Sequence, residues 1–124
     1  MDKIFLEGTE DTPKILLNAD TEIYEISGRS LPEDSAEFYK PVLNWLEAFK
    51  SSGVKKCNFE FKLEYFNTAS SKLILDVLTK LENCKEAGID VKIVWYHRDD
   101  DEDMQEAGEE FSELVEVPFE FKVY

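Results

Sequence analysis

The stretch KCNFEFKLEYFNTASSKLILDVL, residues 56–78, contains a strand pattern, a polar joint and the beginning of a helix pattern. The apolar residues of the strand pattern share one parity: Cys57, Phe59, Phe61, Leu63 and Tyr65. The polar residues between them are Asn58, Glu60, Lys62 and Glu64. Because successive side chains of a strand point to opposite faces, the pattern predicts a strand over residues 56–66 with one apolar and one solvated face.

Apolar residues recur at helical spacing after the joint. One stripe holds Leu73, Val77, Leu81 and Cys84, and Ile74 and Leu78 flank it. The stripe predicts a helix from about Ala69 to Ala87, capped by Gly88. Alternation then resumes from Ile89 to Trp95. A strand, a helix and a strand in this order over residues 56–96 predict a right-handed parallel crossover.

The N-terminal third carries short apolar pieces separated by turn residues. They predict strands at residues 4–6, 14–17 and 22–26, the last ending at Ser27-Gly28. A helix follows, capped by Asp34 or Ser35, with Phe38, Val42, Trp45 and Phe49 at helical spacing and Gly53 as the stop. Pro41 lies inside this pattern and predicts a kink or a break. A last strand is expected at residues 119–124.

Three strands alternate between apolar and polar residues, which favours a sheet that is covered on one face only. The expected fold class is α/β: a two-layer fold with a mixed β-sheet and the helices mainly on one face. No linker or repeat interrupts the pattern, so residues 1–124 are expected to form a single domain of ordinary size.

The charge of the chain restricts its partners. The formal net charge is −14, from 28 acidic and 14 basic residues, which disfavours nucleic acid and anionic membranes as partners. The N-terminus lacks the pattern of a signal peptide, and no apolar run is long enough to cross a bilayer. Cys57 and Cys84 are expected to be separate buried thiols. These features predict a cytoplasmic protein.

The sequence offers weak support for metal binding or catalysis. Four acidic residues fit a calcium-loop template: Asp99, Asp101, Asp103 and Glu110. The template needs glycine at its sixth position, where Met104 stands, so an acidic first turn of a helix is the better interpretation. His97 is the sole histidine, which argues against zinc. No glycine-rich phosphate loop is present. No cofactor is expected, and a small enzyme using His97 or the acidic residues is the weaker alternative.

The polar joint, residues 67–71, has two interpretations. In the first, Asn67 or Thr68 caps the helix, and Ser70 or Ser71 satisfies an amide of the first turn. In the second, a hydroxyl at this helix N-terminus is also a phosphorylation site, because free amides and the helix dipole stabilise a phosphate there. Lys72, near the first turn, would then help to hold the phosphate.

The chain resembles the SiaC family of bacterial regulatory phosphoproteins over nearly its whole length. The segments that carry the resemblance are Gly8-Thr9, Thr12-Pro13, Gly28, Pro32-Glu33, Trp45-Leu46, residues 65–72, Trp95-Tyr96, residues 102–104, residues 108–111 and Pro118-Phe119. Their order and spacing together are more specific than any one of them. The family resemblance implies a fold similar to STAS domains, such as the anti-sigma-factor antagonists.

The resemblance also implies a function. It places the acceptor of reversible phosphorylation on Thr68, with a dedicated kinase and a PP2C-type phosphatase as partners. The unphosphorylated form would bind a GGDEF-domain diguanylate cyclase and promote cyclic di-GMP synthesis, without being an enzyme itself. The expected docking residues are Phe66, Asn67, Thr68, Ser70, Ser71 and Lys72. An anti-sigma-factor antagonist that switches partners in transcription control is the alternative.

Overall fold

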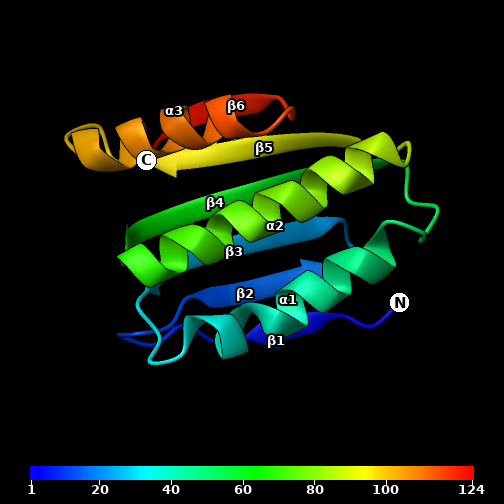
Figure 1. Ribbon diagram of the computed structural model, residues 1–124, viewed down its shortest axis with the longest axis horizontal. Coiled ribbons are helices and arrows are strands. Elements are labelled where there is room, and N and C mark those ends of the chain that lie inside the picture. Colours follow the sequence, from blue (N-terminus) through cyan, green and yellow to red (C-terminus); the bar gives the residue numbers. More distant parts are fainter.

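The computed structural model describes all residues from 1 to 124. The elements in chain order are β1 (Ile4–Leu6), β2 (Lys14–Asn18), β3 (Ile23–Ser30), α1 (Ser35–Phe49), β4 (Lys56–Phe66), α2 (Thr68–Glu86), β5 (Asp90–His97), α3 (Glu102–Leu114) and β6 (Phe119–Val123). The strands form one six-stranded sheet in the order in which they occur in the chain. The three helices cover one face of this sheet (Figure 1).

The pairing of the strands explains why the three helices lie on the same face of the sheet. Strands β1, β2 and β3 pair antiparallel, and β3, β4, β5 and β6 pair parallel. Each parallel step is a strand–helix–strand crossover, and all three steps advance in the same direction across the sheet. Because such crossovers are right-handed, α1, α2 and α3 must pack on the same side. The expected two-layer α/β fold with a mixed sheet is confirmed.

The two faces of the sheet differ as the alternation predicted. A cluster of 27 buried residues fills the space between the sheet and the helices. The opposite face carries charged side chains, which form ion pairs between neighbouring strands. Lys14 lies 3.6 Å from Glu25, and Lys92 lies 3.3 Å from Glu120. These exposed pairs add little stability, and they are typical of a solvated face.

Two boundaries differ from the expectations. Strand β3 continues through Gly28, which has a φ of 98°, to Ser30, and all three residues from 28 to 30 pair with β4. Pro41 was expected to kink or break the helix, and a break is wrong, since α1 is continuous from Ser35 to Phe49. Asp34 caps α1 by accepting a hydrogen bond from the Glu37 amide at 3.1 Å.

A bulge near the end of β4 overturns the predicted side of Tyr65. Gly28 pairs with Leu63, but Arg29 pairs with Tyr65, so Glu64 is an extra residue in β4. An extra residue reverses the alternation beyond it. Tyr65 is therefore 45% exposed, with the Arg29 guanidinium 5.4 Å from its ring centre, and Phe66 faces the helices instead.

Both cysteines lie in the core as free thiols, as expected. Cys57 belongs to β4 and Cys84 to α2. None of the helices has the length and apolar character that a membrane span requires.

Candidate functional site

The joint between β4 and α2 is held by its own backbone and by Asn67. Asn67 is the N-cap of α2, with extended φ and ψ angles of −86° and 175°. Its side-chain oxygen accepts a hydrogen bond from the Ser70 amide at 2.8 Å, and its carbonyl accepts one from the Ser71 amide at 3.0 Å. The prediction that Asn67 or Thr68 caps this helix is confirmed for Asn67, and Thr68 is the first helical residue.

The three hydroxyls of the joint have different environments. Thr68 is exposed, Ser71 is half-buried and Ser70 is completely buried. The Ser70 hydroxyl accepts a hydrogen bond from the Ser30 hydroxyl of β3 at 2.8 Å. A partner protein cannot touch Ser70 while this turn is folded, so Ser70 is removed from the expected docking residues. The burial follows from the helical geometry, which turns position 70 toward the sheet when position 68 faces outward.

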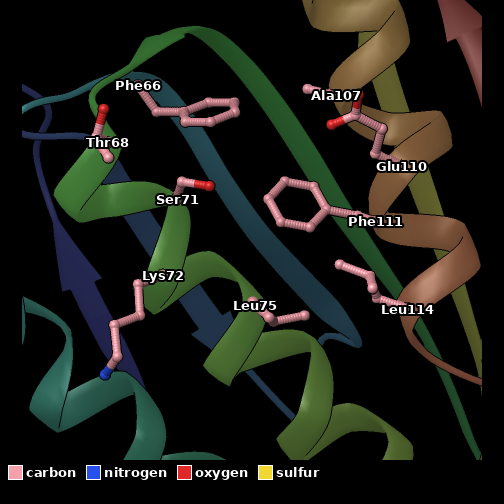
Figure 2. Close-up of a pocket in the computed structure, with 9 residues that line it drawn as sticks. All are labelled: Phe66, Thr68, Ser71, Lys72, Leu75, Ala107, Glu110, Phe111 and Leu114. Atoms are coloured by element: carbon pink, nitrogen blue, oxygen red, sulfur yellow. The ribbon is translucent and has the colours of Figure 1, made fainter.

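An apolar hollow of about 410 Å³ opens beside Thr68, between α2 and α3. Nine residues line it: Phe66, Thr68, Ser71, Lys72, Leu75, Ala107, Glu110, Phe111 and Leu114. Figure 2 shows the rings of Phe66 and Phe111 pointing into the space between the helices. Their ring centres are 6.1 Å apart. Leu114 is 63% exposed, so this hollow presents apolar surface to solvent.

A second hollow, of about 460 Å³, lies on the other side of Phe66. Its lining includes Tyr65 and Met104, together with the carboxylates of Glu64, Asp101 and Asp103. Phe66 lines both hollows, and it does so because the bulge in β4 turns it toward the helices. Phe66, at the end of β4, is thus shared by two concave patches, of which the first also includes Thr68.

Charge is distributed unevenly around the joint. Lys72 is exposed and lies 3.9 Å from Asp76, a weak pair on the surface of α2. Its side chain points away from the hollow in Figure 2. On the opposite wall, α3 carries no basic residue between Glu102 and Leu114. Glu110 contributes a carboxylate to this wall.

The weaker alternatives, a small enzyme or a metal site, depend on His97 and on the acidic residues at the start of α3. His97 is 7% exposed, and its Nδ1 lies 3.0 Å from the Arg98 carbonyl oxygen. Asp101 caps α3 by accepting a hydrogen bond from the Met104 amide at 3.0 Å. Glu102 and Asp103 occupy the first turn of α3, which confirms the interpretation of this acidic run as a helix start. No group of three His, Cys, Asp or Glu side chains is arranged to hold a metal ion.

The α3 wall of the hollow was not among the docking residues expected from the sequence. Ala107, Phe111 and Leu114 follow one another at helical spacing, which is a visible signal of an apolar stripe. Such a stripe normally indicates core packing. The tertiary structure leaves its C-terminal end partly uncovered, since Leu114 is 63% exposed at the edge of the hollow between α2 and α3.

The mixed sheet covered on one face, with an exposed threonine at the start of α2, places the chain among small two-layer α/β proteins. The family model described as "SiaC family regulatory phosphoprotein" matches residues 6–124, and the chain belongs to this family. A curated protein of Pseudomonas aeruginosa strain UCBPP-PA14 is 31% identical over 124 residues, which cover 100% of this chain and 98% of that protein.

Solved structures agree with this assignment. SiaC of Pseudomonas aeruginosa superimposes with a TM-score of 0.90 at 30% identity, over 100% of both chains. A crystal structure of the Pseudomonas aeruginosa diguanylate cyclase SiaD in complex with its activator SiaC contains a matching chain. That chain has a TM-score of 0.90 and 30% identity, over 98% of this chain and 99% of the other.

Proposed function

We propose that this protein binds and activates a GGDEF-domain diguanylate cyclase, and that phosphorylation of Thr68 prevents the binding. The observation that carries the proposal is the position of Thr68, exposed at the rim of an apolar hollow in a chain of the SiaC family. The related SiaC is the activator of the cyclase SiaD, which supports a cyclase as the partner here. The protein would be a regulator in the cytoplasm, and the cyclase would perform the chemistry.

The proposed docking surface is the hollow and its rim. Phe66 and Phe111 form its floor, and Leu114 offers a large exposed apolar area. Burying such area in an interface is favourable by roughly 25 cal/mol per Å². Thr68 and Ser71 supply polar contacts along one edge, Lys72 lies beside them with its ammonium directed away from the hollow, and Asn67 acts by holding the turn. A partner that fills the hollow would cover the Thr68 hydroxyl.

A phosphate on Thr68 would oppose this binding for two reasons. It adds about −1.5 to −2 charges at the rim, and a partner would have to remove water from that charge in order to enter the hollow. It would also add to the negative potential of the α3 wall, where Glu110 lies. A coupling on the order of 1–3 kcal/mol between phosphorylation and binding is enough to switch a modest interface.

The exposure of Thr68 also suits the enzymes that would modify it. A kinase needs access to the hydroxyl oxygen, and Thr68 is exposed while Ser70 is buried. The N-terminus of α2 offers backbone amides and a favourable dipole to the phosphate. We therefore assign the kinase and the PP2C-type phosphatase of the family resemblance to this one hydroxyl.

The test compares Thr68→Ala with Thr68→Asp, using the GGDEF cyclase encoded in the same genome. Calorimetry measures binding, and a nucleotide assay measures cyclic di-GMP synthesis. Thr68→Ala should bind like the wild-type protein, and Thr68→Asp should bind at least tenfold more weakly. Thr79→Asp adds the same charge to an exposed position of α2 outside the hollow and should leave binding unchanged. Equal binding by both Thr68 variants, with the fold intact, would contradict the proposal.

A further inference from the structure

Ser30, the last residue of β3, holds the Thr68 joint from both sides. Its carbonyl oxygen accepts a hydrogen bond from the Asn67 amide at 3.0 Å. Its hydroxyl donates to the Ser70 hydroxyl at 2.8 Å. Asn67 precedes Thr68 by one residue and Ser70 follows it by two. Ser30 is far from the joint in sequence but lies on β3, the strand that pairs with β4. It therefore anchors the chain before and after the exposed threonine.

The anchor continues into α1. The Ser30 and Tyr39 hydroxyl oxygens are 2.6 Å apart, and all three side chains of the chain Tyr39–Ser30–Ser70 are completely buried. Because Ser30 donates to Ser70, Tyr39 donates to Ser30. Burial raises the pKa of Tyr39 to about 12, so its hydroxyl keeps its proton at neutral pH. The buried hydroxyl chain thus links α1, β3 and the first turn of α2.

The bulge in β4 makes this contact possible. Ser30 pairs with Phe66, the residue just before the joint, as a result of the register shift at Gly28. Without the shift, Ser30 would pair one residue earlier in β4, and its hydroxyl would lie out of line with Ser70. The same irregularity that turns Phe66 toward the hollow therefore also places Ser30 beneath the joint.

We propose that Ser30 is a positioning residue for Thr68: it fixes the first turn of α2 so that the Thr68 hydroxyl is presented in one direction to the enzymes that modify it. The inference rests on the proposed role of Thr68 as the phosphate acceptor. Removing the Ser30 hydroxyl leaves the Ser70 and Tyr39 hydroxyls without this partner in a dry interior. Such a loss loosens the turn that carries Thr68.

The test uses Ser30→Ala, with Ser27→Ala as the matched control. Ser27 also lies on β3, but its hydroxyl bonds Glu25 on the solvated face. Hydrogen exchange of the Ser70 and Ser71 amides reports the turn directly. Ser30→Ala should raise their exchange rates about fivefold to tenfold, the effect of losing roughly one hydrogen bond. Ser27→Ala should leave these rates within twofold of the wild type.

Phosphorylation kinetics with the cognate kinase separate positioning from simple loss of structure. Rates are expressed per folded molecule, measured by near-UV circular dichroism. Ser30→Ala should lower kcat for Thr68 about threefold to tenfold and leave KM within twofold, because the exposed contacts remain in place. A general loss of folded protein would leave kcat per folded molecule unchanged. Tyr39→Phe removes the far end of the buried hydroxyl chain and should act in the same direction, with a smaller effect.

Two results would overturn the inference. Unchanged amide exchange and unchanged kcat in Ser30→Ala would remove the role of Ser30 and leave the function of Thr68 intact. If Ser27→Ala changed amide exchange and kcat as much as Ser30→Ala does, the effect would not be specific to the Ser30 hydroxyl. If Ser30→Ala does not fold, Tyr39→Phe decides by the same two measurements. A wild-type chain that gains no phosphate on Thr68 would instead overturn the proposed function itself.

Discussion

Gly108 of α3 lies directly against the indole ring of Trp95 on β5. A Cβ atom at position 108 would stand 2.5 Å from Cδ1 of Trp95 and 2.9 Å from the ring of Phe121. The Trp95 indole nitrogen also donates to the Met104 carbonyl at 3.0 Å. The absent side chain lets α3 approach the sheet closely, and this approach sets the position of the α3 wall of the hollow.

Gly108→Ala is expected to destabilise the protein. Alanine in place of glycine favours a helix by roughly 0.5–1 kcal/mol, but the overlap with Trp95 costs about 1–3 kcal/mol. We expect a net loss of about 1–2 kcal/mol in the free energy of unfolding, measured with urea. Glu113→Ala, on the exposed side of α3, should change it by less than about 0.5 kcal/mol. A stabilised Gly108→Ala would show that α3 packs more loosely than the structure indicates.

Gly28→Ala tests the cost of an unfavourable backbone conformation, whereas Gly108→Ala tests the cost of a steric overlap. No heavy atom lies within 4 Å of a Cβ at this position, but its φ of 98° is strained for any residue with a side chain. The expected loss is about 1–2 kcal/mol. Because Gly28 adjoins the bulge that aligns Ser30 with Phe66, amide exchange at the start of α2 should also increase. Gly53→Ala shares a positive φ, 81°, but lies far from the joint, so it should lower stability without changing that exchange.

Leu114→Ala should separate binding from stability. The side chain is 63% exposed at the edge of the hollow, so the free energy of unfolding should change by less than about 0.5 kcal/mol. Binding to the cyclase should weaken about tenfold, the effect of truncating an apolar contact residue at the interface. Val123→Ala, at a position 58% exposed on β6 and outside the hollow, serves as the control. Unchanged binding by Leu114→Ala would place the interface elsewhere.

The buried thiols predict a loss of stability at alkaline pH. Burial raises the pKa of Cys84 to about 11, and burial together with the nearby Cys84 raises the pKa of Cys57 further, both from an ordinary value of 9.0. The folded state therefore keeps these protons when the unfolded state has lost them. Their contribution is fully present below pH 9 and declines as the pH rises toward 11, by about 1.4 kcal/mol per pH unit for each thiol.

Urea unfolding under reducing conditions at pH 8, 9 and 10 measures this slope. Between pH 8 and pH 9 the buried tyrosines contribute little, and they begin to contribute at pH 10, because Tyr24 and Tyr39 have an ordinary pKa of 10.0 when unfolded and a pKa raised by burial to about 12 in the folded state. Cys84→Ala should reduce the slope of the free energy of unfolding against pH by about half, whatever its effect on stability at pH 8. An unchanged slope in this variant would contradict the role of the thiols.

Local patterns predicted most of the secondary structure. The alternation in β4 and the stripe in α2 located both elements, and the cap at Asn67 fixed the start of α2. The errors occurred where a neighbouring strand decides the outcome. Tyr65 was expected on the apolar face, and pairing with β3 moved it to the other. A different error concerns α1, which is continuous from Ser35 to Phe49 although Pro41 was expected to kink or break it.

Periodicity and capping act over a few neighbouring residues, and they are enough to predict the strand–helix order, the two unlike faces of the sheet and the hydroxyl-rich joint at Thr68. Which of the three hydroxyls is exposed, and which residues surround it, depends on contacts between elements that are far apart in the chain. Ser70 is buried because Ser30, forty residues earlier, lies beneath it. The hollow exists because α2 and α3 lie side by side on the same face of the sheet. Their relative position depends on strand register and close packing, which no local sequence pattern encodes.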